Sequence, residues 1–216
     1  MKKLLIIILT VSFVSGFCQE FRTGISITNK FSKKTEAGIK YQSRFYTRSP
    51  MSKYADVLQL SGKHEIFKNL GVTGAVRYSR YRTEQGLSDL MPDYPDRLKF
   101  YIGTFYQSKR MGGYRHSAKL QYLHSDYFSD KQKNFLNLEY NLNYKAGETI
   151  RFLFGSELIM DFAEPRYPDL RGFFGGIITY GRTELEISYM AECKNMVPPV
   201  TYTSYIQVMI GFEFGK

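Results

Sequence analysis

The stretch from Leu136 to Tyr144, which reads Leu-Asn-Leu-Glu-Tyr-Asn-Leu-Asn-Tyr, decides the fold class. Every second residue is leucine or tyrosine, and the residues between them are asparagine or glutamate. A β-strand separates two such sets, because successive side chains point to opposite faces of a sheet. An α-helix would mix them around its circumference. This stretch therefore predicts a strand with one apolar and one polar face.

The same alternation recurs along most of the chain, for example over 37–45, 98–102, 185–189 and 206–214. We predict ten antiparallel strands, near residues 36–47, 54–67, 71–83, 95–108, 114–127, 134–145, 149–161, 169–181, 183–193 and 201–214. Most are longer than the roughly 9–11 residues that a tilted membrane-spanning strand needs. The pattern indicates an all-β, antiparallel transmembrane (outer-membrane) β-barrel of about ten strands, with twelve as the alternative.

Four features favour a membrane barrel over a soluble one. The expected strands are long, and their connections alternate between short and long, as periplasmic turns and outer loops do. The chain begins with an export signal, and its last strand ends in Phe212 and Phe214, similar to the ending that barrel-assembly machinery recognises. We therefore expect a bacterial outer-membrane location. An even number of strands would place both termini on the periplasmic side.

The N-terminal 35 residues divide into two parts. Residues 1–18 are predicted to be a signal peptide, with Lys2 and Lys3 before a short apolar core, although Cys18 could instead be a lipidated first residue. Residues 19–35 form an N-terminal segment in which Gly24 to Phe31 also alternates. That segment is an extra strand, a piece inside the lumen, or half of a further hairpin. The barrel is expected over 36–216.

The composition excludes several classes of partner and cofactor. The formal net charge is +10, but the basic residues are dispersed, and export argues against nucleic acid. Cleavage after Cys18 leaves Cys193 as one cysteine, so no intramolecular disulfide is expected. Metal-ligand spacing is absent, and we expect neither a metal nor another cofactor. The expected partners are outer-membrane lipid, lipopolysaccharide and the barrel-assembly machinery; the oligomeric state stays open.

The polar face supplies the candidate functional residues, because it would face the lumen of a membrane barrel. Bases dominate its first five strands and acids its last five. In a closed cylinder the basic strands and the acidic strands form two arcs that face each other. Their charges either pair across a filled lumen or create an electric field across a narrow pore. The lumen-facing charged candidates are Lys40, Arg44, Lys63, Arg77, Arg97, Lys99, Lys119, Glu139, Arg151, Glu157, Arg171, Glu184 and Glu186.

Catalytic chemistry is not expected. The histidines are His64, His116 and His124, and a lipid hydrolase would need a serine and an orienting partner beside one of them. Ser125 follows His124, but neighbouring strand residues point to opposite faces. We therefore expect a narrow solute pore or a passive envelope component. The alternatives are a membrane-embedded lipid hydrolase or acyltransferase, and an accessory or adhesion protein acting through its loops.

Several motifs between Leu58 and Phe214 resemble a family of uncharacterised outer-membrane β-barrels, domain of unknown function 2490. The stretches that carry the resemblance are 96–100 (DRLKF), 154–157 (FGSE), 167–176 (YPDLRGFFGG) and 185–190 (LEISYM). The family often begins with a Trp-containing strand, whereas this chain has Phe21 and no Trp. The resemblance implies the fold and the location, and on family analogy it marks Arg97, Glu157 and Arg171 as lumenal residues.

Overall fold

The computed structural model describes residues 18–47, 52–81, 97–127, 133–165, 168–194 and 201–215. The predicted signal peptide up to Phe17 and most of the longer connections lie outside these residues. Within the described residues there is no helix of the length and apolarity that a membrane span requires. The fold is all-β, as the alternation predicted.

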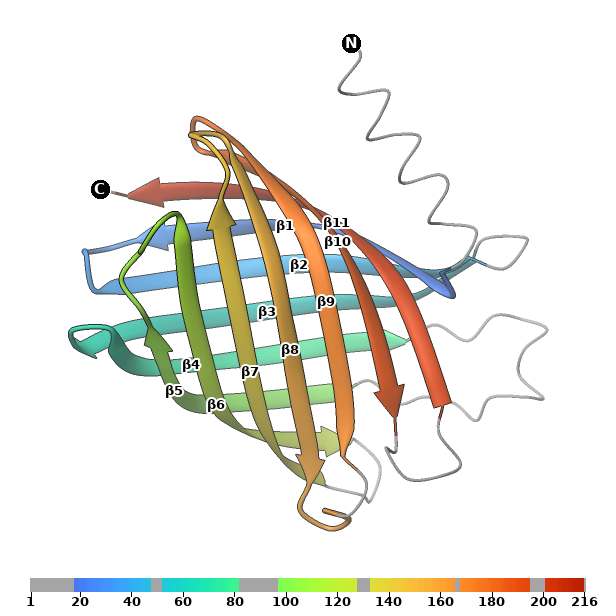
Figure 1. Ribbon diagram of the computed structural model, residues 1–216. Coiled ribbons are helices and arrows are strands. Elements are labelled where there is room, and N and C mark those ends of the chain that lie inside the picture. The colour runs from blue at the N-terminus through green and yellow to red at the C-terminus, as the bar shows by residue number, and fades with distance from the viewer. Residues whose placement is uncertain are drawn as a thin grey trace, which may run out of the picture.

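Eleven strands make up the described chain (Figure 1). They are β1 (Glu20–Lys30), β2 (Thr35–Tyr46), β3 (Ser52–Phe67), β4 (Leu70–Tyr81), β5 (Arg97–Gln107), β6 (Tyr114–Tyr127), β7 (Lys133–Lys145), β8 (Ile150–Asp161), β9 (Asp169–Tyr180), β10 (Thr183–Lys194) and β11 (Thr201–Gly215). Consecutive strands pair antiparallel, and β1 pairs with β11 in parallel to close the barrel. Closure leaves no strand edge unpaired, as lipid requires.

The closing strand corrects the predicted count of ten, or twelve, strands. Residues 20–30, which the sequence left open, form β1 between β2 and β11, so the barrel begins at Glu20 rather than at residue 36. Ile25 lies opposite Ile210 and Ile27 opposite Phe212, so the outward apolar surface continues across this seam. The segment is therefore part of the barrel wall and does not lie inside the lumen.

An odd number of strands also places the ends of the barrel at opposite rims. Because β1 runs parallel to β11, Glu20 lies at the rim where β11 begins, and Gly215 lies at the rim where it ends. The expectation that both termini lie on one side is therefore wrong for this barrel.

The two rims differ in the length of their connections. We call them the long-connection rim, which holds 47–51, 82–96, 128–132, 162–168 and 195–200, and the short-turn rim, which holds 31–34, 68–69, 108–113, 146–149 and 181–182. Two of the short turns depend on left-handed residues, Asn69 (φ 73°) and Gly181 (φ 59°). Hairpin turns of two residues commonly need such a backbone, which glycine and asparagine adopt most readily.

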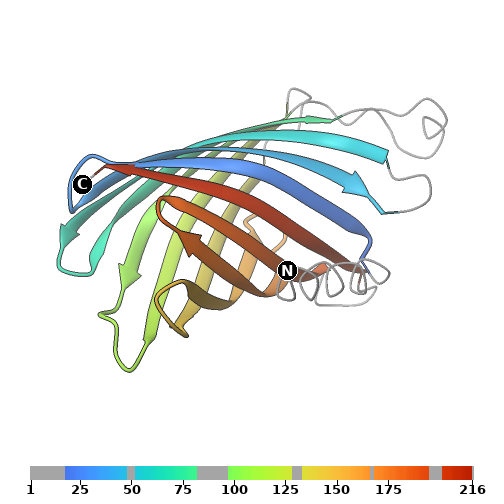
Figure 2. The same cartoon turned by 90° about the horizontal axis from the view of Figure 1, so that it is seen from above.

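The interior of the barrel is polar and charged, whereas its exterior is apolar. Outward side chains such as Leu60 (54% exposed), Ile102 (66%) and Phe174 (55%) are large and apolar. Buried polar side chains such as Gln42, Gln121, Asn137 and Glu192 point inward. This is the arrangement of a membrane-spanning β-barrel, in which the apolar band faces hydrocarbon and the interior is polar. Figures 1 and 2 show β1–β4 on one side of the barrel and β6–β9 on the other, with the strands crossing.

Two inward glycines allow close approach of neighbouring strands. A Cβ at Gly24 would lie 2.1 Å from the carbonyl oxygen of Tyr41, and a Cβ at Gly103 would lie 2.1 Å from that of Leu120. Only glycine fits such positions, where another backbone approaches closely. These glycines therefore let the wall bend around the lumen.

Candidate functional site: the barrel lumen

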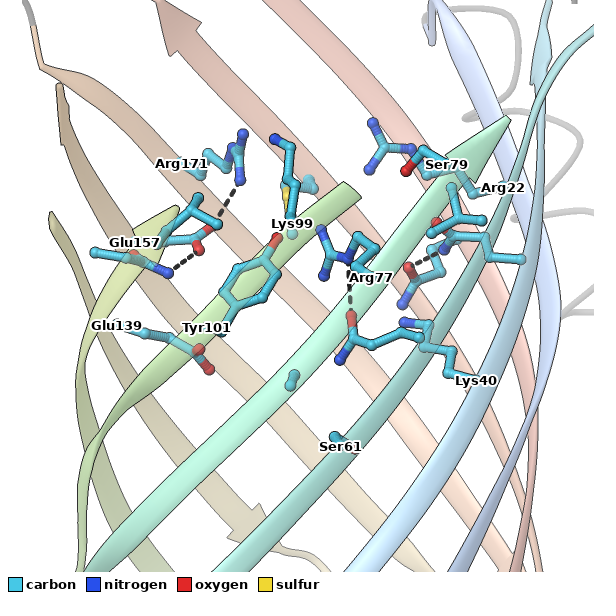
Figure 3. Close-up of a pocket in the computed structure, with 18 of the residues that line it drawn as sticks. Arg22, Lys40, Ser61, Arg77, Ser79, Lys99, Tyr101, Glu139, Glu157 and Arg171 are labelled. Carbon is cyan, nitrogen blue, oxygen red and sulfur yellow. Dashed lines mark hydrogen bonds and ion pairs between the residues drawn. The ribbon is translucent and has the colours of Figure 1, made fainter. Parts of the chain in front are cut away.

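The lumen holds a cavity of about 910 Å³, and all eleven strands contribute residues to its wall. Figure 3 shows part of this lining, including Arg77, Tyr101 and Glu157. The cavity reaches from Glu20 and Lys194 near the long-connection rim to Glu36 and Lys63 toward the other rim. Its volume is within the range of small-molecule pockets, which is about 300–1,000 Å³. The lining includes eleven Lys and Arg residues and seven Asp and Glu residues. The site is therefore an enclosed, charged space with an excess of positive charge.

The structure places eleven of the thirteen predicted lumen-facing residues in the cavity wall. They are Lys40, Arg44, Lys63, Arg77, Arg97, Lys99, Lys119, Glu139, Glu157, Arg171 and Glu186. The other two, Arg151 on β8 and Glu184 on β10, form an ion pair with each other near the short-turn rim. They keep the inward register but do not line the cavity, because strand ends extend beyond it.

Sequence reasoning missed several lining residues. Glu20 and Arg22 lie in the segment that was not assigned to the barrel, and Gln42, Gln59 and Gln207 carry no charge. Strand parity could have found the first two glutamines, because Gln42 alternates with Lys40 and Arg44, and Gln59 lies two residues before Ser61 on the same face. Gln42 and Gln59 are important because they accept hydrogen bonds from Arg44 and Arg77.

One side of the lumen, on β6–β10, carries a row of opposite charges that we call the paired wall. It consists of Lys119, Glu139, Glu157, Arg171 and Glu192, which are direct cross-strand neighbours. Arg171 donates from Nη1 to Glu157 Oε2 at 2.9 Å, and from Nε and Nη2 to Glu192 Oε1 at 3.0 and 2.9 Å. Lys119 Nζ donates to Glu139 Oε2 at 2.8 Å.

Amide side chains complete the paired wall. Asn137 Nδ2 donates to Glu157 Oε1, and Asn141 Nδ2 donates to Glu139 Oε1, both at 2.6 Å. Charged groups removed from bulk water are stabilised when they are paired and hydrogen-bonded in this way. Each carboxylate of the paired wall therefore has a cationic partner on an adjacent strand.

The opposite side, on β2–β5, carries cations without such partners, and we call it the basic wall. It consists of Lys40, Arg44, Arg77 and Lys99. Arg77 Nε donates to Gln59 Oε1 at 2.8 Å, and Arg44 Nε donates to Gln42 Oε1 at 3.2 Å. Among the described residues, no carboxylate lies within ion-pair distance of these four cations. Neutral amides therefore take the place that carboxylates hold in the paired wall.

Most charges pair locally and not across the lumen. Glu157, Glu192 and Glu139 are engaged within the paired wall, and Glu186 accepts hydrogen bonds from Ser188 and Gln207. The cations whose charge acts on Lys99 include Arg171 from the facing wall, together with arginines of its own side. Of the two predicted outcomes, pairing across the lumen is not seen among the described residues. The two sides of the cavity instead differ in charge.

The histidines do not assemble a catalytic site in the described part of the chain. His64, His116 and His124 fall on the outward register, where each ring hydrogen-bonds a polar neighbour: Thr35, Tyr140 and Asn134, respectively. Ser125 points inward and is fully buried, so it cannot serve His124. The described residues also hold no group of three or more metal-ligating side chains. The absence of enzymatic activity stays a prediction.

Comparison with known proteins does not assign the chain to a family. No protein-family model and no curated protein matches the chain, so the resemblance to domain of unknown function 2490 stays a prediction. Among solved structures, the chain is similar to an anion-selective porin from Comamonas acidovorans, with 11% sequence identity and a TM-score of 0.40. The match covers 83% of this chain and 53% of the porin.

Proposed function

We propose that this protein is an outer-membrane pore that passes small hydrophilic solutes through its lumen. The observation that carries the proposal is the cavity of about 910 Å³ enclosed by all eleven strands. Barrels of about eight strands are filled by their own side chains, whereas those of sixteen or more leave an aqueous channel. An eleven-stranded barrel lies between these cases, and its lumenal space is narrow.

The lining supports a water-filled lumen. Eighteen ionisable side chains line the cavity, and the basic wall includes four without a carboxylate partner among the described residues. An ionised group that is neither solvated nor paired is very costly to bury. Water in contact with these cations removes that cost, so the lumen is expected to stay hydrated.

The proposed placement in the membrane follows from the rims. Outer-membrane barrels have short periplasmic turns and longer outer loops, so the long-connection rim would face outward and the short-turn rim the periplasm. Gly215 then lies at the periplasmic rim and Glu20 at the outer one. The apolar exterior would contact lipid and lipopolysaccharide, and Phe212 and Phe214 would present the chain to the barrel-assembly machinery.

Conductance in planar lipid bilayers tests the proposal. The purified barrel is expected to give discrete current steps. Ser61, on the lumenal side of β3, and Leu60, on its outer side, offer a matched pair of variants. Ser61→Trp should lower the single-channel conductance at least about twofold, because a large side chain narrows the path, while Leu60→Trp should leave it unchanged. Absence of steps, or equal conductance in both variants, would contradict a lumenal path.

A further inference from the structure

We propose that the basic wall binds small anions that carry carboxylate or phosphate groups, which makes the pore selective for them. This inference rests on the proposed function, since it names the solute class of the same lumen. It is carried by four inward residues in one cross-strand row: Lys40 on β2, Gln59 on β3, Arg77 on β4 and Lys99 on β5. Figure 3 shows Lys40, Arg77 and Lys99 on this side of the cavity.

The row brings like charges side by side, and a negative group bound beside them would offset their repulsion. Lys99 lies directly opposite Arg77, and like charges in that position destabilise a sheet. The same chain places carboxylates between cations in the paired wall, so the means of neutralising such a row is available to it. Gln59 lies between Lys40 and Arg77, where a glutamate would neutralise both. An anion from solution would complete the row in its place.

The N–H donors of the row that make no hydrogen bond within the described part of the protein are suited to bind an oxyanion. Among the described residues, Arg77 donates only its Nε to the protein, so Nη1 and Nη2 are available to a ligand. The guanidinium lies 5.0 Å from the ring centroid of Tyr101, a cation–π contact that holds it in place. A planar guanidinium matches carboxylate and phosphate, and lysine adds charge to either. Gln59 accepts from Arg77 through Oε1, which leaves its amide nitrogen as a further donor.

Reversal potentials and phosphate block of the current test this inference. With a KCl gradient across the bilayer, the wild-type pore is expected to favour chloride over potassium, and inorganic phosphate should reduce the chloride current. Gln59→Glu places a carboxylate beside Arg77 with almost no change in size. Because a charge a few ångströms away acts strongly in a confined space, it should raise the half-blocking phosphate concentration at least about tenfold and lower the anion preference.

Gln107→Glu is the matched control, because Gln107 ends β5 at the short-turn rim, away from the row. It should change the half-blocking concentration less than about twofold, since water and salt screen a charge at the mouth. A pore that conducts but prefers cations, or that responds equally to both variants, would overturn the anion site and leave the pore standing.

Calorimetry separates failure of the pore from failure of the site. If the barrel carries no current, the proposed function fails, and titration of the same folded barrel in detergent with phosphate still tests the basic wall. Binding by the wild type that is lost in Gln59→Glu and kept in Gln107→Glu would support the site. Equal binding by all three proteins, or none by the wild type, would overturn it.

Discussion

The paired wall and the basic wall face the same lumen, yet they handle charge in opposite ways. In the paired wall Arg171 contacts two carboxylates, and Lys119 contacts a third. In the basic wall Arg77 and Arg44 contact glutamine amides instead. Both walls consist of antiparallel strands and line the same cavity. The difference therefore lies in the choice of a neutral residue, such as Gln59, where a carboxylate would have been the stabilising choice.

This comparison separates stability from function within one barrel. Pairs between adjacent strands hold the paired wall together and leave its charges satisfied. Cations without carboxylate partners contribute less to stability. Their electric field is directed into the lumen, where charged side chains commonly determine ion selectivity. We infer that the paired wall maintains the barrel and the basic wall acts on the solute.

The largest effect is expected on stability, when the ion pairs of the paired wall are removed. Arg171→Met should lower the free energy of unfolding by about 3 kcal/mol, because it leaves Glu157 and the buried Glu192 without a cation. Arg77→Met, the same substitution in the basic wall, should change that free energy by less than about 1 kcal/mol, since it loses one hydrogen bond and relieves repulsion. Urea unfolding in lipid vesicles measures both. Equal losses would remove the distinction between the walls.

An intermediate effect is expected when one cation of the basic wall is neutralised. Lys99→Gln should lower the anion-to-cation permeability ratio about threefold, because one of the four cations that act on the solute is lost. The double variant Lys119→Gln/Glu139→Gln removes one charge of each sign from the paired wall and should leave the ratio unchanged. Reversal potentials in a salt gradient compare the two. A larger effect from the double variant would show that the paired wall, and not the basic wall, determines the selectivity.

The smallest effect is expected outside the cavity. Arg151 and Glu184 pair near the short-turn rim and do not line the cavity. Arg151→Gln should change the anion-to-cation permeability ratio, measured from reversal potentials, much less than Lys99→Gln does, because water and salt screen charges at the rim. A loss of selectivity as large as that of Lys99→Gln would show that the rim, and not the basic wall, selects the solute.

Much of the wall could be predicted from sequence, because the period of two assigns side chains to faces without knowledge of the partner strands. Lys40, Arg77 and Glu157 were placed inward on that basis alone. The strand count could not be predicted in the same way. Residues 20–30 alternate like a strand and pair with β2, but the parallel pairing with β11 is what closes the barrel, and pairing between chain ends leaves no local signal.

The contrast between the walls was also beyond the sequence. Which cations lack carboxylates depends on cross-strand register, for example on Arg77 meeting Gln59 while Arg171 meets Glu157. The order of bases and acids along the chain suggested two opposed arcs. It did not reveal that the glutamates of the paired wall form ion pairs with Arg171 and Lys119 on the same side of the lumen, since those pairs depend on which residues are neighbours on adjacent strands.

Thiol labelling in lipid vesicles tests the central claim, that a basic, hydrated lumen lies behind an apolar exterior. Gln59 and Leu60 are adjacent on β3 and point to opposite faces. In a chain whose native cysteines are replaced by serine, Gln59→Cys should react with charged methanethiosulfonates, faster with the anionic reagent than with the cationic one, while Leu60→Cys stays protected by lipid. Fast labelling of Leu60→Cys, or a preference of Gln59→Cys for the cationic reagent, would contradict this account.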